Sequence, residues 1–400
     1  MFRSVSALAS LLLAAAILYA GNGLQGTLLA VRGNLEGFPT ALIGALMSAY
    51  FAGFILGCRI NPKFIKSVGH IRTFIALASV ASAVTLVHPL VVHVAAWAIL
   101  RAVTGFCFAG MIMVIESWIN ERAENAHRGR VLAVYRIIDM AATVGGNALL
   151  AVASPMGFEL FAIVSILVSL ALVPVALTRS PAPRPVETAR LNVPRLFKVS
   201  PLAAIGAPMI GLANASFWAV GPVYAQAMGY EKDVVAWFMS AVVLGAGIMI
   251  WPLGALSDRI DRRFVMIGSA IAGAAAALAL AEFGDRSVPT LVILAALFGA
   301  FVLPMFGLAA AHANDRADRA HALETNGGLL LLHSCGSIVG ATLGAAVMDG
   351  FGPQALFTYI AFVYIALAAV CLYRIQRRPS PSARLDPPGL AHPALTPGAR

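Results

Sequence analysis

The sequence predicts an all-α membrane protein with twelve transmembrane helices in two six-helix pseudo-repeat bundles. Three observations lead to this prediction. Hydrophobic residues make up 60% of the chain and charged residues only 12%, whereas soluble domains carry about 25% charged residues. The apolar residues gather in runs of roughly 20, the length that a helix needs to cross about 30 Å of hydrocarbon. A strip rich in proline and cationic residues separates six runs from six.

Each apolar run is expected to be a helix, because lipid offers the backbone no hydrogen-bond partners. The first run exceeds the usual length of about 7–15 residues for the apolar part of a signal peptide, so we interpret it as a retained helix. The expected spans are 5–29, 40–58, 73–90, 92–117, 131–153, 157–178, 201–226, 234–256, 264–283, 289–311, 324–347 and 354–373.

The Lys and Arg residues predict which loops face the cytoplasm. If the N-terminus lies inside, the outside loops contain only Arg32, Lys232 and Arg286 of the 28 cationic residues, and Arg101 and Arg136 fall within spans. All the others lie in inside segments, as the positive-inside rule requires. We therefore expect a multi-pass protein of the bacterial inner membrane with both termini in the cytoplasm.

The strip between the sixth and seventh spans predicts the domain organisation. It is rich in proline and cationic residues, with Glu187 as its single acid. The tail is rich in Pro and Ala without apolar periodicity, which is typical of disorder. We expect an N-terminal six-helix bundle (1–178), a cytoplasmic linker (179–200), a C-terminal six-helix bundle (201–376) and a disordered cytoplasmic tail (377–400).

Composition and motif searches exclude several classes of protein. The net charge of +10 is spread over short gaps between apolar runs, whereas a nucleic-acid binder gathers cations on one face among exposed aromatics. The four cysteines lack metal-ligand spacing and are interpreted as packing residues. The chain contains neither a G-x-x-x-x-G-K-[ST] run nor an H-E-x-x-H run. We expect no nucleic-acid partner, no metal, no cofactor and no enzymatic activity.

A loop motif provides the first resemblance to a known family. Residues 254–263, GALSDRIDRR, resemble the major facilitator signature G-x-L-x-D-R-x-G-R-R between helices eight and nine, with Asp261 in place of the second glycine. In this interpretation the small glycine lets helices approach closely, and the acid pairs with arginines to latch the cytoplasmic side. The alternative is a basic loop with an incidental acid. The gating residues implied are Gly254, Asp258, Arg259, Arg262 and Arg263.

A weaker copy of this loop follows the second span, which supports an internal repeat. It runs from Gly57 to Asn61, with Asn61 where the acid should be and Pro62 where the arginine should be. Any latch there must be weaker or differently built.

The fourth span contains RAVTGFCFAG at 101–110, which resembles the superfamily's R-x-x-x-G motif, where the arginine is linked to proton coupling. An intramembrane arginine is costly and is a functional hypothesis by default; the alternative is a structural arginine bonded to backbone carbonyls. His333, in the eleventh span, is a second coupling candidate because its side chain titrates near neutrality. A hydrogen-bonded packing histidine is the alternative.

Four further segments indicate a branch of the superfamily. Residues 116–122, 128–135 and 312–316, with Gly327-Gly328-Leu329-Leu330, resemble the YcaD-like bacterial branch, to which riboflavin transporters of the RfnT type are similar. The drug-antiporter signature G-x-x-x-G-P-x-x-G-G of the fifth helix is represented only by Gly145-Gly146. The resemblance implies a transporter and favours vitamin uptake over drug efflux.

Polar residues within the spans are the substrate-binding candidates. Asn22 and Gln25 share a face of span one, and Asn214 and Trp218 share a face of span seven, the equivalent helix of the second half. Uncharged amides beside an aromatic ring suit a neutral polar-aromatic solute bound between the halves. Hydrogen bonding between helices is the alternative interpretation.

The remaining intramembrane charges are interpreted as follows. Arg136 and Asp139, three residues apart, are expected to pair, in a structural role or in substrate contact. Glu116 and Glu324 lie near inner helix ends, where carboxylates either exchange protons or form caps and salt bridges.

The leading functional hypothesis is secondary active transport of a small organic solute by alternating access, coupled to protons as a symporter, with riboflavin uptake as the specific candidate. The alternative within this class is a metabolite or multidrug efflux antiporter. A membrane-embedded enzyme and a non-transporting sensor are the other classes considered. We expect a monomer whose partners are the lipid bilayer, protons and the solute.

Overall fold

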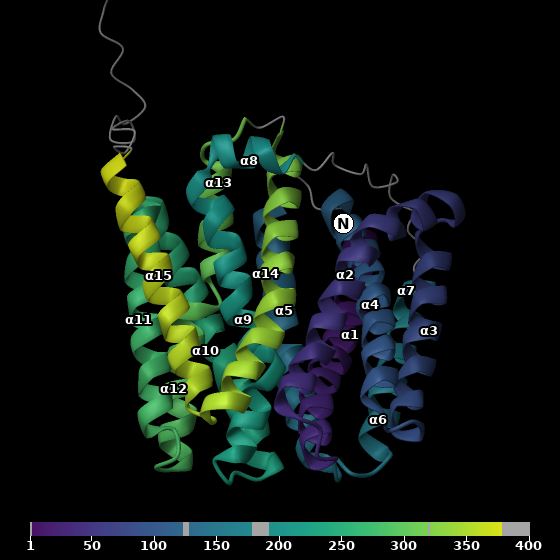
Figure 1. The fold of residues 1–400 in the computed structure, drawn as a ribbon. Coiled ribbons are helices and arrows are strands. Elements are labelled where there is room, and N and C mark those ends of the chain that lie inside the picture. Colours follow the sequence, from purple (N-terminus) through teal and green to yellow (C-terminus); the bar gives the residue numbers. More distant parts are fainter. Residues whose placement is uncertain (1, 123–127, 178–191, 319–320, 378–400) are drawn as a thin grey trace, which may run out of the picture.

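The computed structural model describes residues 2–122, 128–177, 192–318 and 321–377. Within these residues every regular element is a helix, as the sequence predicts. The helices run side by side in two groups, α1–α7 and α9–α15 (Figure 1). The first group contains α1 (Phe2–Leu35), α2 (Thr40–Val68), α3 (His70–Leu90), α4 (Val94–Arg122), α5 (Arg128–Ala148), a 3-10 turn (Leu149–Val152), α6 (Glu159–Leu170) and α7 (Leu172–Ala176). After α8 (Val193–Val199) come α9 (Pro201–Ala227), α10 (Lys232–Arg259), α11 (Arg262–Phe283), α12 (Val288–Val302), α13 (Met305–Asn314), α14 (Ala322–Phe351) and α15 (Ala355–Arg377).

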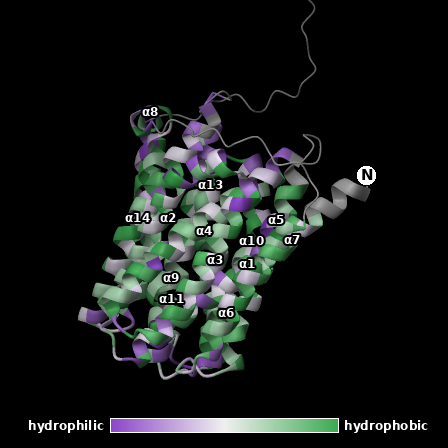
Figure 2. Cartoon of the chain, turned by 90° about the vertical axis from the view of Figure 1, so that its right-hand side faces the viewer, coloured by the Kyte–Doolittle hydropathy of each residue, from purple (hydrophilic) through white to green (hydrophobic). Residues whose placement is uncertain are grey.

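The helices form a bundle whose length and polarity suit a membrane. In the part of the chain that the structure describes, 11 helical segments are long and apolar enough to cross a bilayer. The predicted span that is missing from these 11 is the fifth, which corresponds to α5. This helix is less apolar because it carries Arg136 and Asp139, and it packs between α1 and α10. Hydrophobic residues cover the middle of the bundle and hydrophilic residues gather at its two ends (Figure 2). The predicted all-α membrane fold is confirmed.

Several helix boundaries differ from the expected spans. The first helix continues to Leu35, beyond the expected end at 29. The tenth span is divided into α12 and α13 at Pro304, whose ring removes a backbone hydrogen bond. Within the expected linker, α8 forms a short helix, started by the Asn192 side chain, which accepts a hydrogen bond from the Arg195 amide. The rest of the linker and the tail after Arg377 lie outside the described residues.

Close helix crossings repeat in the two groups and reveal the internal repeat that the sequence shows only weakly. In the first group α2 crosses α4, and in the second α10 crosses α12 in the equivalent way. Each crossing uses one glycine from each helix, because a Cβ there would collide with a backbone carbonyl of the other helix. The glycines are Gly53 and Gly105 in the first group, and Gly245 and Gly299 in the second.

The two ends of the bundle differ. The N-terminus of the chain, α8 and the end of α15 lie at the same end (Figure 1). We call this the basic end, because it carries the loops rich in arginine and lysine, and we call the other the opposite end.

Candidate functional site

The two bundles are joined near the opposite end. Where α1 meets α9, the Asn34 amide donates to the Gln226 side chain over 3.1 Å. Where α2 meets α14, the Ser48 hydroxyl donates to the Ile338 carbonyl over 2.5 Å and lies 2.7 Å from the Thr342 hydroxyl. These contacts close the opposite end of the interface between the bundles.

A lysine adds a charged contact to this closure. The Lys232 ammonium, at the start of α10, donates to the Ala153 and Ala151 carbonyls over 2.8 and 3.0 Å. Deeper in the interface the Ser240 hydroxyl approaches the Val144 carbonyl of α5 at 3.5 Å. Between residues that the structure describes, all hydrogen bonds that join α1–α7 to α9–α15 lie on the opposite-end side of the bundle.

The first pair of predicted substrate residues is engaged within the N-terminal bundle. Gln25 is 5% exposed and donates to the Thr85 hydroxyl over 3.1 Å. Asn22 accepts a hydrogen bond from the Tyr50 hydroxyl at 3.3 Å. Together with Thr104 they line a small cavity inside this bundle. In this conformation both amides therefore bond neighbouring helices.

The second pair lies in the C-terminal bundle. The Asn214 side chain accepts from the Tyr364 hydroxyl over 2.9 Å, and this hydroxyl also lies 3.3 Å from the Val302 carbonyl. Trp218 is half-buried and packs its ring against Phe217 with a 5.3 Å centroid separation. No hydrogen bond in the described structure links this pair to Asn22 or Gln25.

Arg101 is buried without a carboxylate partner. Its side chain is 3% exposed, Nη2 donates to the Met47 sulfur at 3.4 Å, and the guanidinium lies 4.3 Å from the centre of the Tyr50 ring. Nη1 has no hydrogen-bond partner. The R-x-x-x-G spacing explains the cation–π contact, because the small Gly105 lets the Tyr50 backbone approach α4 closely. The alternative of an arginine bonded to carbonyls is not what the structure contains.

His333, the second coupling candidate, packs against an aromatic ring. Its imidazole meets the Phe306 ring edge to face, with centroids 4.6 Å apart. The ring makes no hydrogen bond to a described residue. It therefore differs from the hydrogen-bonded packing histidine that is the alternative interpretation.

Three helices of the N-terminal bundle bring together a polar cluster that no sequence spacing indicated. The Tyr19 hydroxyl of α1 lies 2.8 Å from the Tyr135 hydroxyl of α5, and the Tyr135 hydroxyl lies 3.4 Å from a Glu116 carboxylate oxygen of α4. The predicted Arg136–Asp139 pair forms at 2.7 Å on α5. This pair lies on the same helix as Tyr135, whose hydroxyl contacts Glu116.

This polar cluster lies beside the interface between the bundles. The Arg136 side chain is 58% exposed, and the Glu116 side chain is also exposed. One turn beyond Arg136, Met140 lies where a Cβ on Gly247 of α10 would contact it at 3.5 Å. Charged groups of the N-terminal bundle are thus accessible to solvent next to the C-terminal bundle.

The signature segment forms a charge cluster at the basic end. Asp258 pairs with Arg262 at 3.0 Å, and Arg262 pairs with Asp315 of the loop after α13 at 2.6 Å. Arg262 also donates to the Ser257 hydroxyl over 2.8 Å. Among the described residues this cluster belongs wholly to the C-terminal bundle. Asp258 is 68% exposed, so its carboxylate remains accessible to a partner across the interface.

The departure from the signature at Asp261 has a structural explanation. The Asp261 carboxylate accepts from the Arg263 amide over 3.0 Å, so it caps α11. It also pairs with the Arg263 guanidinium at 2.6 Å. Arg259 is exposed. Gly254 corrects one expectation: a Cβ there would meet no heavy atom within 4 Å, so no close helix approach uses this glycine in the present conformation.

The first-half copy of the motif is a helix-packing element. Asn61 is fully buried, and its amide donates to the Phe106 carbonyl of α4 over 3.0 Å. A Cβ on Gly57 would crowd the same carbonyl at 2.6 Å. The residue at the acid position therefore ties α2 to α4.

Two helical bundles that cross a membrane, are joined at one end and hold accessible charged groups at their interface define a polytopic membrane transporter. The profile of the Major Facilitator Superfamily matches residues 11–231 and 203–398. The chain belongs to this superfamily.

Curated relatives place the chain near uncharacterised members of the superfamily. It is 27% identical over 358 residues to the uncharacterized MFS-type transporter Ent638_1421 of Enterobacter sp. (strain 638), covering 87% of this chain and 90% of that protein. It is 26% identical over 353 residues to the uncharacterized MFS-type transporter YcaD of Salmonella typhi, with the same coverage. The predicted similarity to the YcaD-like branch is confirmed.

Solved structures support the fold alone. The nucleoside transporter NupG superposes with a TM-score of 0.78 at 16% identity, covering 92% of this chain and 99% of that chain. A bacterial homolog of the human lysosomal transporter Spinster, inward-facing and occupied, has a TM-score of 0.75 at 14% identity, covering 93% and 98%.

Proposed function

We propose that this protein is a proton-coupled secondary transporter that moves a small organic solute across the bacterial inner membrane by alternating access. The observation that carries the proposal is the one-sided closure of the bundles, which are joined by Ser48 and Lys232 near the opposite end. The positive-inside rule puts the basic end, with both termini, in the cytoplasm. The arrangement then corresponds to an inward-open conformation.

Glu116 is the residue that we propose carries the proton. It is an exposed carboxylate on a spanning helix, it contacts the Tyr135 hydroxyl, and it forms no salt bridge with a described residue. Closing the basic end would remove this carboxylate from water, which is costly for its charged form, so protonation favours passage through a closed state. The Arg136–Asp139 pair, on the same helix as Tyr135, is proposed to exchange partners when Glu116 gains or loses its proton.

Arg101 and His333 act with Glu116 in this proposal. The incompletely bonded guanidinium of Arg101 and the unbonded imidazole of His333 are groups whose partners can change between conformations. We therefore propose that Glu116 binds the proton first, and that Arg101 and His333 change partners in response.

The substrate class follows from the amides and the indole near the bundle centre. We assign substrate contact to Asn22, Gln25, Asn214 and Trp218 in the substrate-bound state. The three amides bond Tyr50, Thr85 and Tyr364 in this structure, so a solute must offer hydrogen-bonding groups in exchange. A neutral polar-aromatic molecule meets this requirement, and riboflavin is the first such molecule to test.

The test is flux into proteoliposomes with an imposed pH gradient. Riboflavin, a panel of other vitamins and common drugs are first screened for thermal stabilisation of the purified protein, and the stabilising compounds are then used for flux. We expect proton-driven uptake that Glu116→Gln uncouples from the gradient. Glu282→Gln, an exposed carboxylate at the opposite end of α11, is the matched control and keeps coupling. Gradient-independent flux in the unmodified protein would refute proton coupling, and no flux for any stabilising compound would refute transport.

Efflux by antiport is the second candidate, and the charge of the polar cluster favours it. Glu116 and Asp139 outnumber Arg136, so the cluster suits an organic cation that exchanges with a proton. The two candidates differ in the direction of flux under the same gradient. Accumulation of the solute on the acidic side of the membrane would establish antiport, and accumulation on the alkaline side would establish symport.

A further inference from the structure

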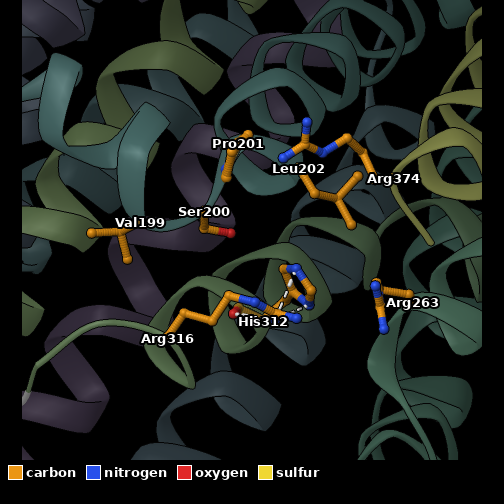
Figure 3. A pocket seen from close by; sticks show the side chains of 8 residues that line it. All are labelled: Val199, Ser200, Pro201, Leu202, Arg263, His312, Arg316 and Arg374. Atoms are coloured by element: carbon orange, nitrogen blue, oxygen red, sulfur yellow. Dashed lines mark hydrogen bonds between the residues drawn. The ribbon is translucent and has the colours of Figure 1, made fainter. Parts of the chain in front are cut away.

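A second pocket lies in the C-terminal bundle at the basic end, apart from the proposed transport path. Its walls come from the junction of α8 and α9, the start of α11, the end of α13 and the end of α15. A cavity of about 30 Å³ has space for about two water molecules, or for the inner oxygens of a larger oxyanion. The lining residues are Val199, Ser200, Pro201, Leu202, Arg263, His312, Arg316 and Arg374 (Figure 3).

The Ser200 side chain provides the first evidence for a ligand. It is fully buried and lines the pocket, yet its Oγ has no hydrogen-bond partner. Ser200 is the N-cap of α9, but its hydroxyl does not cap the helix. Buried hydroxyls nearly always have a partner, so a group in the pocket that accepts a hydrogen bond would explain this one.

The N-terminus of α9 adds donors at the same place. Pro201 has no amide hydrogen, and the amides of the next residues, starting with Leu202, belong to the first turn of a 27-residue helix. The first-turn amides of a long helix carry partial positive charge and favour anions.

Cationic side chains surround this space (Figure 3). Arg374 makes no hydrogen bond or ion pair with a residue that the structure describes, and it is half-buried. Arg316 donates to the His312 ring over 3.0 Å, and Arg263 is paired with Asp261. None of the described residues that line the pocket carries a carboxylate. Positive charge near Arg374 and Arg316 is therefore concentrated next to an unpaired hydroxyl.

We propose that this pocket binds a phosphate-type oxyanion, which accepts a hydrogen bond from Ser200 and charged hydrogen bonds from Arg316 and Arg374. Guanidinium groups match phosphate oxygens in geometry and charge. The phosphate belongs either to the headgroup of an anionic phospholipid, which basic pockets between spanning helices bind, or to a soluble phosphate compound. The positive-inside rule accounts for arginines at this end, but it does not account for the buried Ser200 hydroxyl.

Residues of the pocket are sequence neighbours of residues of the gate. Arg263 lines the pocket and Arg262 holds Asp258; Arg316 lines the pocket and Asp315 holds Arg262. An anion that fixes the pocket residues also fixes the adjacent gate residues in their present pairing, so we expect it to slow turnover. This consequence rests on the proposed transport function, whereas anion binding does not.

Binding is tested on the full-length protein in phosphatidylcholine nanodiscs, titrated with inorganic phosphate at constant ionic strength and followed by thermal unfolding. We expect saturable stabilisation that Arg374→Gln weakens about tenfold or more in apparent affinity, the scale of a hydrogen bond to a charged group. Arg377→Gln is the matched control, since Arg377 lies one turn further on α15, is exposed, and contacts Tyr373 instead of the pocket. Ser200→Ala, which removes only an unpaired hydroxyl, is expected to weaken binding about threefold or more.

Nanodiscs that contain phosphatidylglycerol distinguish the two sources of phosphate. For a lipid headgroup, phosphatidylglycerol stabilises the parent protein more than the Arg374→Gln variant, and inorganic phosphate then adds nothing. For a soluble ligand, inorganic phosphate stabilises equally in both lipids, and phosphatidylglycerol affects Arg374→Gln and Arg377→Gln alike. The proposal is overturned if neither probe distinguishes Arg374→Gln or Ser200→Ala from Arg377→Gln. If Arg374→Gln does not fold, the comparison of Ser200→Ala with Arg377→Gln alone tests the proposal.

The coupling to the gate is measured separately, as solute flux with and without phosphate in the unmodified protein and in Arg374→Gln. We expect phosphate to slow solute flux in the unmodified protein and to leave flux in Arg374→Gln unchanged. Anion binding without any solute flux would contradict the proposed function and keep the anion site, whereas flux without an Arg374-dependent response to either inorganic phosphate or phosphatidylglycerol would do the reverse.

Discussion

Replacing Arg101 by methionine separates stability from function at the centre of the N-terminal bundle. Methionine has nearly the same length and no charge, and its flexible side chain fills irregular spaces. If Arg101 were held by structural hydrogen bonds, its replacement would lower the stability of the protein. Arg101 instead has an unpaired Nη1 and a sulfur as its hydrogen-bond partner, so we expect the variant to be more stable than the parent.

The magnitude follows from the contacts. A buried donor without a partner costs about 1–3 kcal/mol, and an arginine at the centre of a membrane helix costs about 2.5–3.5 kcal/mol on insertion scales. The cation–π interaction with the Tyr50 ring, 4.3 Å from the guanidinium, offsets about 2 kcal/mol of this cost when it is desolvated. The balance predicts that Arg101→Met stabilises the protein by about 1.5–4.5 kcal/mol, which for a chain of this length raises Tm by about 2–5 °C.

The assay is thermal unfolding in detergent, with pH-dependent flux measured in parallel on the same preparations. Arg286→Met is the matched control, because the Arg286 guanidinium lies 4.2 Å from the Phe283 ring but is exposed at the opposite end. We expect the control to change stability by no more than about 0.5 kcal/mol. Arg101→Met is expected to abolish the pH dependence of flux.

Two results would refute this reasoning. A loss of several degrees in Tm for Arg101→Met, with Arg286→Met unchanged, would mean that the charge is structural. An unchanged pH dependence of flux in a folded Arg101→Met protein would remove Arg101 from the coupling role.

Two further predictions concern the opening and closing of the two ends. Asp258→Ala is expected to lower the turnover rate about tenfold while solute affinity changes less than about twofold, because the exposed carboxylate pairs here only within its own bundle; equal loss of both contradicts the latch. Lys232→Gln removes the ammonium that joins the bundles at Ala151 and Ala153, so hydrogen exchange of residues 34–48 is expected to rise about fivefold, the population shift for about 1 kcal/mol. Unchanged exchange would show that this contact does not hold the opposite end closed.

The fold was predictable because it depends on residue averages over whole spans. Span length and the alternation of basic loops are both properties of about 20 residues, and they tolerate local errors. Contacts between neighbours on one helix were also predictable, as the Arg136–Asp139 pair shows. The helix α5 is the limiting case: its charges lower its hydropathy, and its place in the bundle depends on packing between α1 and α10.

The polar cluster was not predictable in the same way. Tyr19, Glu116 and Tyr135 come from three helices, and their meeting depends on how each helix is rotated about its axis. No spacing within one helix carries this information. The same reason applies to Gly254, whose close contact was expected from the motif, whereas the conformation of the two bundles decides whether another helix approaches it.

The last prediction tests whether the first-half motif, Gly57 to Asn61, still has a gating role or serves only in helix packing. Asn61→Asp restores the acid of the signature with almost no change in shape. The Asn61 amide donates to the Phe106 carbonyl in a fully buried site, and a carboxylate there would face that carbonyl without a donor. Loss of the hydrogen bond and burial of an unpaired acid predict destabilisation of about 3 kcal/mol or more.

Asn192→Asp is the control for this substitution, since Asn192 is exposed and its side-chain oxygen accepts from the Arg195 amide, which aspartate does equally well. Thermal unfolding of both variants gives the comparison. An Asn61→Asp protein as stable as Asn192→Asp would show that the site accepts the family's acid, and a latch would then be the better account of this position. A large loss in Asn61→Asp alone would mean that asparagine is required there, because the crossing of α2 and α4 depends on its amide.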